Sequence, residues 1–408
     1  MKVCVVGSGG REHALAHVLA RTASVVVTPG NPGIPGSLAA DPLSLDADLF
    51  VIGPEAPLVD GLADRLRGQG KLVFGPGASG ARIEGSKAWM KALLVEAGVP
   101  TAAYGTFSAD DESAALDFLS SLPAPYVVKT DGLAAGKGVL VTESLDEARA
   151  AVIAYLSGAA FGSAGERVVI EEYLSGPELS ILAVCDGIRA VALAPAQDFK
   201  RIDDRDEGPN TGGMGAYSPV PIVDDHLVDE VMRIAVQPTL DALVARGIDY
   251  RGVLYAGLAL TDAGPKVIEF NCRFGDPESQ VVLPRVTSDL AELLAQAAAG
   301  SLTVTPTFSD DAYVTVVCST EGYPVAPRTG DVIEGIHAAE ATGATVFCAG
   351  VGADDQGRLI TAGGRVLAVT GSGATIGGAR DAAYAAVDHI TWPGRHRRTD
   401  IAALAAGQ

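Results

Sequence analysis

The densest group of side chains that could do chemistry lies at residues 267–278, which read VIEFNCRFGDPE. Alternation along a strand places Glu269 and Asn271 on the same face, and Arg273 joins them if the strand continues. Two oxygen ligands at this spacing form half of a Mg²⁺ site, with substrate phosphates supplying the rest. The alternative is a polar pair on a solvated sheet face. The polar cluster from Arg273 to Glu278, on a strand otherwise built to be buried, argues against that alternative.

Lysines near a glycine-rich loop form a second candidate site. Lys129 stands within the apolar segment YVVKT, where burying an ammonium group is costly unless an anion compensates it. Lys137 follows within GLAAGKG, residues 132–138. This loop is not a Walker A loop, because it has too few residues between its glycines and no hydroxyl after the lysine. The alternative for Lys129 is a surface lysine whose stem lies along apolar neighbours.

The first glycine loop, GSGGREH at residues 7–13, follows a strand and precedes a helix, as a dinucleotide fingerprint does. Its third glycine position holds Glu12, and a carboxylate there would repel a pyrophosphate. A single phosphate on the loop N–H groups stays plausible. His13 could point towards this loop or simply pack on the helix. An NAD-linked oxidoreductase is the alternative from another enzyme class; NAD binding without ATP- and glycine-dependent phosphate release would support it.

Covalent nucleophilic catalysis is not indicated, because the sequence has no Gly-x-Ser-x-Gly motif and no credible Cys–His arrangement. A long irregular polar segment runs from Gln197 to Ser218. Loops of this length inside a compact domain are usually functional or disordered, and the composition of this one favours function.

Composition bounds the possible partners. The chain has 408 residues and a net charge of -20, which argues against nucleic acid or an anionic membrane surface as the main partner. Its 49 glycines exceed the roughly 29 expected from typical usage. They cluster between apolar runs and helices, which indicates tight turns or ligand loops. Five scattered cysteines, no signal peptide and no long apolar run predict a cytoplasmic protein with reduced thiols.

The elements that must position these residues follow from hydropathy. Short apolar strands alternate with helices over residues 1–75, which predicts an N-terminal doubly wound parallel sheet. Longer, antiparallel-looking strands are expected at 178–185, 190–196, 252–261 and 266–270, with a long amphipathic helix at 224–246. From about residue 323 the chain predicts a small C-terminal α+β domain. The fold class is therefore α/β and α+β, multidomain.

Taken together, these segments resemble the ATP-grasp ligases, and most closely their phosphoribosylamine–glycine ligase family. The matching segments run in order from residue 4 to about 370: GSGGREHALA, PGNPG, VIGPEAPLVDGLAD, FGP, EGSKAWMK, VVKTDGLAAGKGV, VIEEYLSGPELS, QDFKR, GPNTGGMGAYSP, YAGL, VIEFNCRFGDPE, YPVAPRTGDVI and GGRVLAVT.

The resemblance implies ligation of glycine to 5-phosphoribosylamine with ATP and Mg²⁺ or Mn²⁺. The products would be glycinamide ribonucleotide, ADP and phosphate, formed through glycyl phosphate in purine biosynthesis. It implies small-molecule substrates, no nucleic acid, no membrane and a monomer. It also implies a division into residues 1–100 for substrate binding, 101–122 and 187–322 for the catalytic subdomain, 123–186 for the lid, and 323–408 for the C-terminal domain.

The family's site residues carry over onto matching positions. Glu269 and Asn271 would hold the metal, and Arg273, Asp198 and Lys137 would be catalytic. The ATP-binding residues would be Lys87, Lys129, Lys137, Glu171, Glu172, Leu174 and Glu178, with the adenine recognised largely by backbone groups. The substrate-binding residues would be Gly9, Gly10, Asn31, Glu55, Thr211, Gly213, Met214, Gly215, Ser218, Arg273 and Asp276.

Two features depart from the wider pattern. Gly257, within YAGL, stands where many ATP-grasp enzymes carry a further metal-binding carboxylate, which agrees with this family and not with the superfamily at large. The chain is also short between PGNPG and VIGPE, with residues 44–46 where a further helix usually lies. That puts the helix of this crossover in question.

Overall fold

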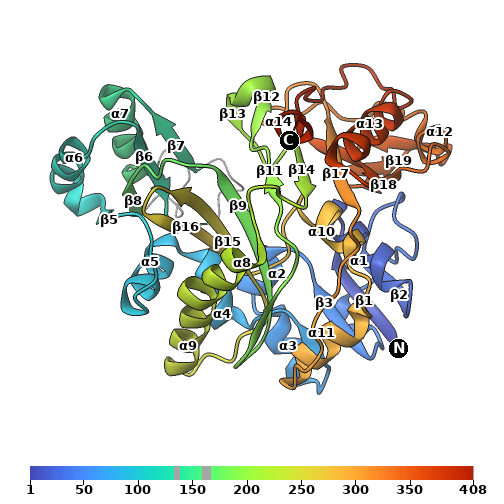
Figure 1. Ribbon diagram of the computed structural model, residues 1–408, viewed down its shortest axis with the longest axis horizontal. Helices are drawn as coiled ribbons and strands as arrows, with labels where there is room; N and C mark the ends of the chain where they lie inside the picture. The colour runs from blue at the N-terminus through green and yellow to red at the C-terminus, as the bar shows by residue number, and fades with distance from the viewer. Residues whose placement is uncertain (133–137, 159–166, 408) are drawn as a thin grey trace.

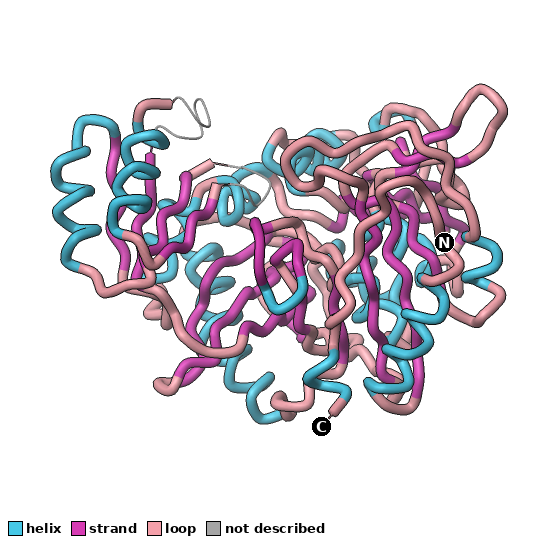
Figure 2. The backbone as a smooth tube through the Cα atoms, turned by 90° about the horizontal axis from the view of Figure 1, so that it is seen from above, coloured by secondary structure: helices cyan, strands magenta, loops and turns pink. Residues whose placement is uncertain are grey.

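The computed structural model describes residues 1–132, 138–158 and 167–407. The N-terminal and C-terminal units lie beside one another, and the segment from β5 to β8 forms a separate lobe at the opposite end (Figures 1 and 2). Strands β9, β15 and β16 lie between them (Figure 1). None of the helices in the described part of the chain has the length and apolar character needed to cross a bilayer.

The N-terminal unit is the predicted parallel sheet, with strand order β2-β1-β3-β4. β1 pairs in parallel with β2 and with β3, because its apolar run is buried on both faces. Residues 30–48 between β2 and β3 hold only the 3-10 turn Pro42–Ser44, so the questioned crossover helix is absent from this segment, all of which the structure describes. The elements are β1 Lys2–Gly7, α1 Gly10–Leu19, β2 Ser24–Pro29, β3 Leu49–Ile52, α2 Glu55–Val59, α3 Leu62–Gly68, β4 Val73–Phe74, α4 Ala78–Gly85 and α5 Lys87–Glu96.

The separate lobe, called the lid below, comprises residues 104–172. Its sheet has the order β5-β8-β6-β7 and its own hydrophobic cluster, which includes Leu119, Val152 and Ile170. The predicted division differs at both ends, since it gave residues 101–122 to the catalytic subdomain and ended the lid at 186. β5 pairs with β8, whereas β9 pairs with β15. The elements are β5 Tyr104–Ser108, α6 Glu112–Ser121, β6 Tyr126–Thr130, β7 Val139–Thr142, α7 Leu145–Leu156 and β8 Arg167–Glu172.

The central unit is an antiparallel sheet with the order β10-β9-β15-β16, as the long strands predicted. The helix expected at 224–246 is present as three joined segments, α8, a π-helical turn at Met232–Val236, and α9. The predicted strand at 190–196 is shorter than expected and ends at Ala192. The elements are β9 Glu178–Asp186, β10 Ala190–Ala192, α8 Asp225–Val231, α9 Gln237–Ala245, β15 Arg251–Thr261, β16 Gly264–Asn271, α10 Ser279–Arg285 and α11 Leu290–Ala299.

The C-terminal sheet has the order β11-β14-β17-β21-β18, so it includes strands from the polar segment 197–218. The predicted boundary at 322/323 divides this sheet, because β17 pairs with β21. One continuous hydrophobic cluster joins the N-terminal, central and C-terminal units, while the lid has a separate one. The elements are β11 Gln197–Asp198, β12 Arg201–Asp203, β13 Glu207–Asn210, β14 Gly215–Ser218, β17 Ala312–Ser319, α12 Ile336–Glu340, β18 Thr345–Cys348, β19 Val351–Ala353, β20 Leu359–Thr361, β21 Arg365–Gly373, α13 Ile376–Val387 and α14 Ala403–Ala406.

Candidate active site

A cavity of about 830 Å³ extends between the lid, the central sheet and the N- and C-terminal units. At the lid its wall is apolar and comes from β6, β7 and β16. Towards the other units it is strongly charged, with guanidinium, ammonium and carboxylate groups facing one another. Among the described residues, the apolar wall comprises Val127, Val139, Val141 and Ile268, and the charged wall includes Arg11, Glu55, Glu84, Lys129, Glu178, Asp198, Lys200, Glu269, Arg273, Asp276, Glu278 and Arg365.

The predicted metal pair lies on this wall. Glu269 and Asn271 share one face of β16, and the Asn271 amide donates to Glu269 Oε1 at 3.2 Å. Burial opposes the charge on Glu269, but the ammonium groups of Lys129 and Lys87 outweigh it and hold its pKa below the usual value. Gly257 lies opposite Glu269 on β15, so that position presents no carboxylate.

A metal at this pair would need ligands from elsewhere. Across the described residues, no group of three or more His, Cys, Asp or Glu side chains could hold a metal ion by itself. An ionised carboxylate and an amide oxygen suit Mg²⁺, which usually binds through one or two such groups plus substrate phosphates. The donor set therefore fits half of a nucleotide-bridged metal site.

Arg273 is held between two carboxylates, Glu55, which was expected among the substrate contacts, and Glu84, which was not. Its Nη2 donates to Glu84 Oε1 at 2.7 Å, and its Nε donates to Glu55 Oε2 at 3.3 Å. Burial disfavours the charged guanidinium, yet Glu84 and Glu55 raise its pKa above the usual value. Burial also raises the pKa of Glu84, although Arg273 opposes that shift. Glu84 further accepts from the Cys272 backbone N–H at 2.9 Å, which fixes the end of β16.

The residues expected to recognise adenine lie at the apolar end of the cavity. Glu171, Glu172 and Leu174 all line the cavity beside the apolar wall. The Glu171 side chain is 3% exposed and pairs with Lys129 at 3.0 Å and with Lys91 at 2.9 Å. This carboxylate is therefore already engaged by two lysines, and the expected recognition of adenine by backbone groups stays a prediction.

The lysines expected to contact phosphates differ in their position relative to the cavity. Lys129 lines the cavity, is 4% exposed and pairs with a buried anion, so the surface alternative for it is wrong. Lys87 begins α5, is not among the described residues that line the cavity, and donates to the Gly132 carbonyl at 3.2 Å. Burial lowers the Lys87 pKa, and Glu269 partly offsets this effect. Lys137 lies outside the described residues.

Glu178 and Asp198 are joined by a lysine. Lys200 Nζ lies 2.9 Å from Glu178 Oε2 and 2.7 Å from Asp198 Oδ1. Burial raises the pKa of Asp198, and Lys200 counteracts that shift. Both carboxylates line the cavity, as expected.

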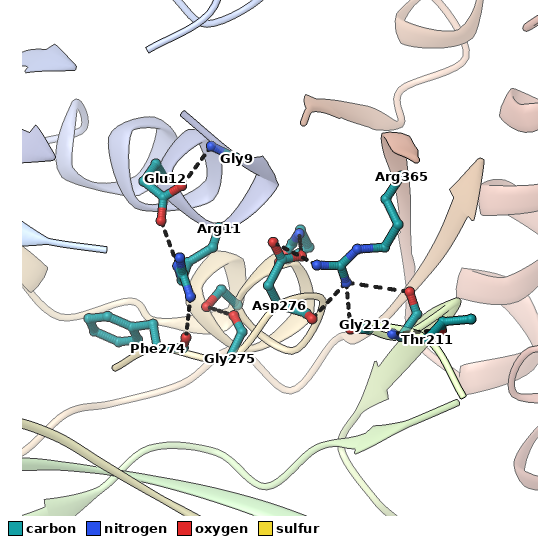
Figure 3. A network of polar contacts seen from close by, with 12 residues as sticks. Gly9, Arg11, Glu12, Thr211, Gly212, Phe274, Gly275, Asp276 and Arg365 are labelled. Carbon is teal, nitrogen blue, oxygen red and sulfur yellow. Dashed lines mark hydrogen bonds and ion pairs between the residues drawn. The ribbon is translucent and has the colours of Figure 1, made fainter. Parts of the chain in front are cut away.

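The far end of the cavity is formed jointly by the N-terminal and C-terminal units (Figure 3). Arg11 donates to the Phe274 carbonyl at 3.2 Å. Arg365, from β21, donates to the carbonyls of Gly212 at 2.6 Å and Asp276 at 2.8 Å, and its Nη2 lies 3.3 Å from Asp276 Oδ2. Burial opposes the charge on Asp276, but Arg365 and Arg11 hold its pKa below the usual value. Two guanidinium groups thus face the charged end.

Several predicted substrate contacts do not reach the cavity. Asn31 is buried at the junction with the C-terminal unit, where its amide donates to the carbonyls of Ser8 and Ala349 and its oxygen accepts from Gly33. Met214 and Gly215 are buried, and the Ser218 hydroxyl donates to Pro195 and accepts from Arg285. Among the described residues, the predicted substrate contacts that line the cavity are Glu55, Thr211, Arg273 and Asp276, and those that do not are Gly9, Gly10, Asn31, Gly213, Met214, Gly215 and Ser218.

The first glycine loop is filled by Glu12. This buried carboxylate accepts from the Gly9 N–H at 2.6 Å and from Arg11 Nε at 2.5 Å. A Cβ on Gly53 would lie 2.0 Å from Glu12 Oε1, and one on Gly7 would lie 2.5 Å from Glu12 Cδ. These glycines make room for a side chain of the protein itself. An internal carboxylate therefore occupies the helix N-terminus where a dinucleotide phosphate would bind.

The structure decides between the two roles considered for His13, because its side chain packs against the C-terminal unit. Its ring is T-shaped against Phe347, and its Nδ1 accepts from the Cys348 backbone N–H at 2.9 Å. Burial lowers the pKa of His13 to about 4, so the ring is neutral and can accept this bond. The residue fixes the C-terminal unit against α1.

Glu278 is a buried carboxyl on the cavity wall that forms no ion pair with another described residue. Its Oε1 accepts from the Tyr255 hydroxyl at 2.6 Å, whereas Oε2 has no hydrogen-bond partner among the described residues. Burial, followed by the charge of Asp198, raises the pKa of Glu278 to about 7. The ionised form is therefore disfavoured in the folded protein.

Glu278→Gln should stabilise the protein at alkaline pH. The folded state binds this proton more tightly than the unfolded chain does, so stability falls as pH rises from the ordinary value of 4.5 to about 7. Gln keeps the acceptor for Tyr255 without the charge. We expect a gain of about 1–3 kcal/mol above pH ~7.5, shrinking towards zero near pH ~4.5. Denaturant unfolding at the two pH values measures it, with the exposed Glu143→Gln as control. A gain that does not change with pH would contradict the assignment.

The site residues that escaped the sequence prediction include Arg11, Glu84, Lys91, Lys200 and Arg365. Lys91 carried a usable signal: it lies one helical turn after Lys87, and like charges at that spacing are unfavourable unless something compensates them. Arg365 came from a different domain, so no local pattern pointed to it.

The central and lid sheets, which enclose a cavity lined by lysines and an acidic–amide pair, define an ATP-grasp enzyme, a class that uses ATP with a divalent metal. The comparison with protein families agrees, because residues 85–279 match the phosphoribosylglycinamide synthetase ATP-grasp (A) domain. Residues 1–84 match the N domain of that synthetase and residues 313–404 its C domain. The chain belongs to the phosphoribosylglycinamide synthetase family.

Relatives agree over the whole length. A phosphoribosylamine–glycine ligase of Streptomyces coelicolor is 50% identical over 429 residues, covering 100% of both chains. One from Mesorhizobium japonicum is 46% identical, covering 98% of this chain and 97% of the relative. The crystal structure of phosphoribosylamine–glycine ligase from Thermotoga maritima has a TM-score of 0.86 at 33% identity, covering 98% of this chain and 100% of that one.

Proposed function

We propose that this protein ligates glycine to 5-phosphoribosylamine with ATP, giving glycinamide ribonucleotide, ADP and phosphate. Family membership along the full chain supports the reaction. The single structural observation that carries it is the ionised Glu269, paired with Asn271 and surrounded by lysines on the wall of the cavity.

The nucleotide would bind between the lid and the central sheet. Its adenine would lie against the apolar wall and meet the backbone of residues 171–174, and Glu178 would accept from the ribose hydroxyls. Lys129 and Lys87 would neutralise phosphate charge. Glu269 and Asn271 would hold Mg²⁺ or Mn²⁺, which supplies charge neutralisation of the phosphates when bound.

The reaction has two steps. A glycine carboxylate oxygen attacks the γ-phosphorus of ATP, the bond to the β,γ-bridging oxygen breaks, and ADP leaves. The amine of phosphoribosylamine then attacks the carbonyl carbon of glycyl phosphate, phosphate leaves, and the amine nitrogen loses a proton. Arg273 would orient the carboxylate and Asp198 would assist, while Glu55, Thr211 and Asp276 would face phosphoribosylamine. The chain's contribution is positioning and charge neutralisation, which explains why no nucleophile is needed.

The remaining assignments belong to the same proposal. We expect small-molecule substrates without nucleic acid or membrane partners, a monomer, and a cytoplasmic setting. Lys137 would contact phosphates as part of the glycine loop.

The decisive assay is ADP release, measured with each substrate omitted in turn. We expect full release only when ATP, glycine and phosphoribosylamine are all present. A related ligase with another substrate would be revealed by equal or faster release with a different amino acid or amine. NAD binding without ATP-dependent release would instead support the oxidoreductase alternative, which the occupied glycine loop at Glu12 disfavours.

A further inference from the structure

We propose that Lys91 is a positioning residue of the nucleotide site: it stays paired with Glu171 and so allows Lys129 to leave that carboxylate for the nucleotide phosphates. The inference rests on the proposed function, which gives Lys129 a phosphate to bind. Lys91 has no part in the site residues expected from the sequence or from the family resemblance.

The three charges form a buried row. Lys91 Nζ lies 2.9 Å from Glu171 Oε2, and Lys129 Nζ lies 3.0 Å from Glu171 Oε1, so each lysine has its own oxygen. The side chains of Lys91, Glu171 and Lys129 are 0%, 3% and 6% exposed. Lys129 lines the cavity and Lys91 does not. One cation therefore faces the ligand, and the other is sealed behind the carboxylate.

This arrangement keeps the buried Glu171 carboxylate compensated when Lys129 moves to a phosphate. A buried carboxylate that loses its only partner is strongly destabilised, because water cannot replace the lost ion pair. If Lys129 were the sole partner of Glu171, its transfer to a phosphate would leave that carboxylate uncompensated. Lys91 remains on the second oxygen, so Lys129 can change partners at low cost.

Lys91 also sits where the lid meets the body. It belongs to α5, which precedes the lid, whereas Glu171 is the second-last residue of β8, just before the chain returns to the central sheet. Lys91 Nζ donates to Thr101 Oγ at 2.8 Å, and Thr101 donates to the Val267 carbonyl of β16 at 2.6 Å. The Lys91 contacts thus connect three parts of the chain: the lid, the segment between α5 and β5 that holds Thr101, and β16, which carries Glu269.

Charge near Lys91 gives the proposal a pH signature. The groups facing it are Glu171 and Glu172 of β8, Lys129 of β6, Glu269 of β16 and the ring of Tyr104 on β5. Burial lowers the pKa of Lys91 to about 8, and Glu171 opposes that shift. Above this pH Lys91 becomes neutral and no longer compensates the Glu171 carboxylate.

The test is calorimetric titration of the full-length protein with MgADP, which needs neither glycine nor phosphoribosylamine. Lys91→Met should raise the dissociation constant about tenfold or more, because Lys129 is then retained by Glu171. K91M/E171Q should recover most of the affinity lost in K91M, because a neutral side chain at position 171 no longer retains Lys129. Lys266→Met, which removes the half-exposed pair with Glu172, is the matched control and should bind normally.

A pH series adds a readout that a merely structural role would not move. Wild-type affinity should weaken as pH rises through about 8, whereas that of Glu171→Gln should change much less. If K91M does not fold, this comparison still decides the matter. Unchanged affinity in K91M, no recovery in the double variant, or equal pH profiles for wild type and E171Q would overturn the proposal. A wild type that does not bind MgADP at all would instead contradict the proposed function.

Discussion

Glu269→Ala should lower kcat for ADP release by about 10³-fold or more while the protein stays folded. The change removes the carboxylate of the proposed metal pair and with it the acceptor for the Asn271 amide. It also leaves the nearby ammonium groups of Lys129 and Lys87 without the charge that they stabilise. These lysines would still attract the nucleotide, so we expect the loss to fall on kcat more than on the KM for ATP.

Steady-state ADP release and the thermal unfolding midpoint should be measured together. The matched control is Glu96→Gln, which removes a carboxylate from the surface ion pair with Arg246. That control should keep nearly full activity. Near-normal turnover of Glu269→Ala would refute the metal assignment. If Glu269→Ala shows no unfolding transition, its loss of activity reports a loss of folding, and Glu269→Gln should be measured in its place.

Arg273→Met should damage both stability and catalysis, by two separable routes. Arg273 pairs with Glu84 at 2.7 Å and Glu55 at 3.3 Å, and removing one partner of a buried ion pair typically costs about 3–5 kcal/mol. The same guanidinium lies beside Asn271 at 3.2 Å, so its removal also takes positive charge from the proposed transfer site. We expect kcat/KM for glycine to fall by about 10²–10³-fold.

The double variant R273M/E84Q separates these routes. Neutralising Glu84 removes the stranded charge, so much of the lost stability should return. Activity should not return, because the guanidinium is still missing. Urea unfolding and ADP release measure the two quantities. Recovery of activity together with stability would show that Arg273 serves only to hold Glu84 and the end of β16.

Much of the architecture was predictable because it depends on local pattern. The period of apolar residues predicted the parallel N-terminal sheet and the long antiparallel strands, since each strand must bury its own apolar face. The spacing of Glu269 and Asn271 placed both on one face of β16, a consequence of strand geometry alone. The boundaries were less predictable: β5 joins the lid through pairing with β8, a partner about 60 residues away that hydropathy does not specify.

The glycine excess shows what the sequence could predict and what it could not. The sequence showed clusters and could not distinguish turns from ligand loops. Only the structure shows that Gly7 and Gly53 accommodate Glu12, and that Gly33 lies against Cys348 of the C-terminal unit, where a Cβ would come within 2.4 Å of the sulfur. In these cases glycine is required by close approach between segments distant in sequence.

The sequence by itself determined which residue types were present, their local spacing, the fold class and the family resemblance. The tertiary structure decided which charges meet. Glu171 compensates two lysines, Glu84 and Glu55 flank Arg273, and Arg365 reaches Asp276 from another domain. The tertiary structure also buries Asn31, Met214, Gly215 and Ser218 at positions that do not line the cavity. Such pairings follow from burial and distance, which chain order does not encode, so they become visible only when the units are packed together.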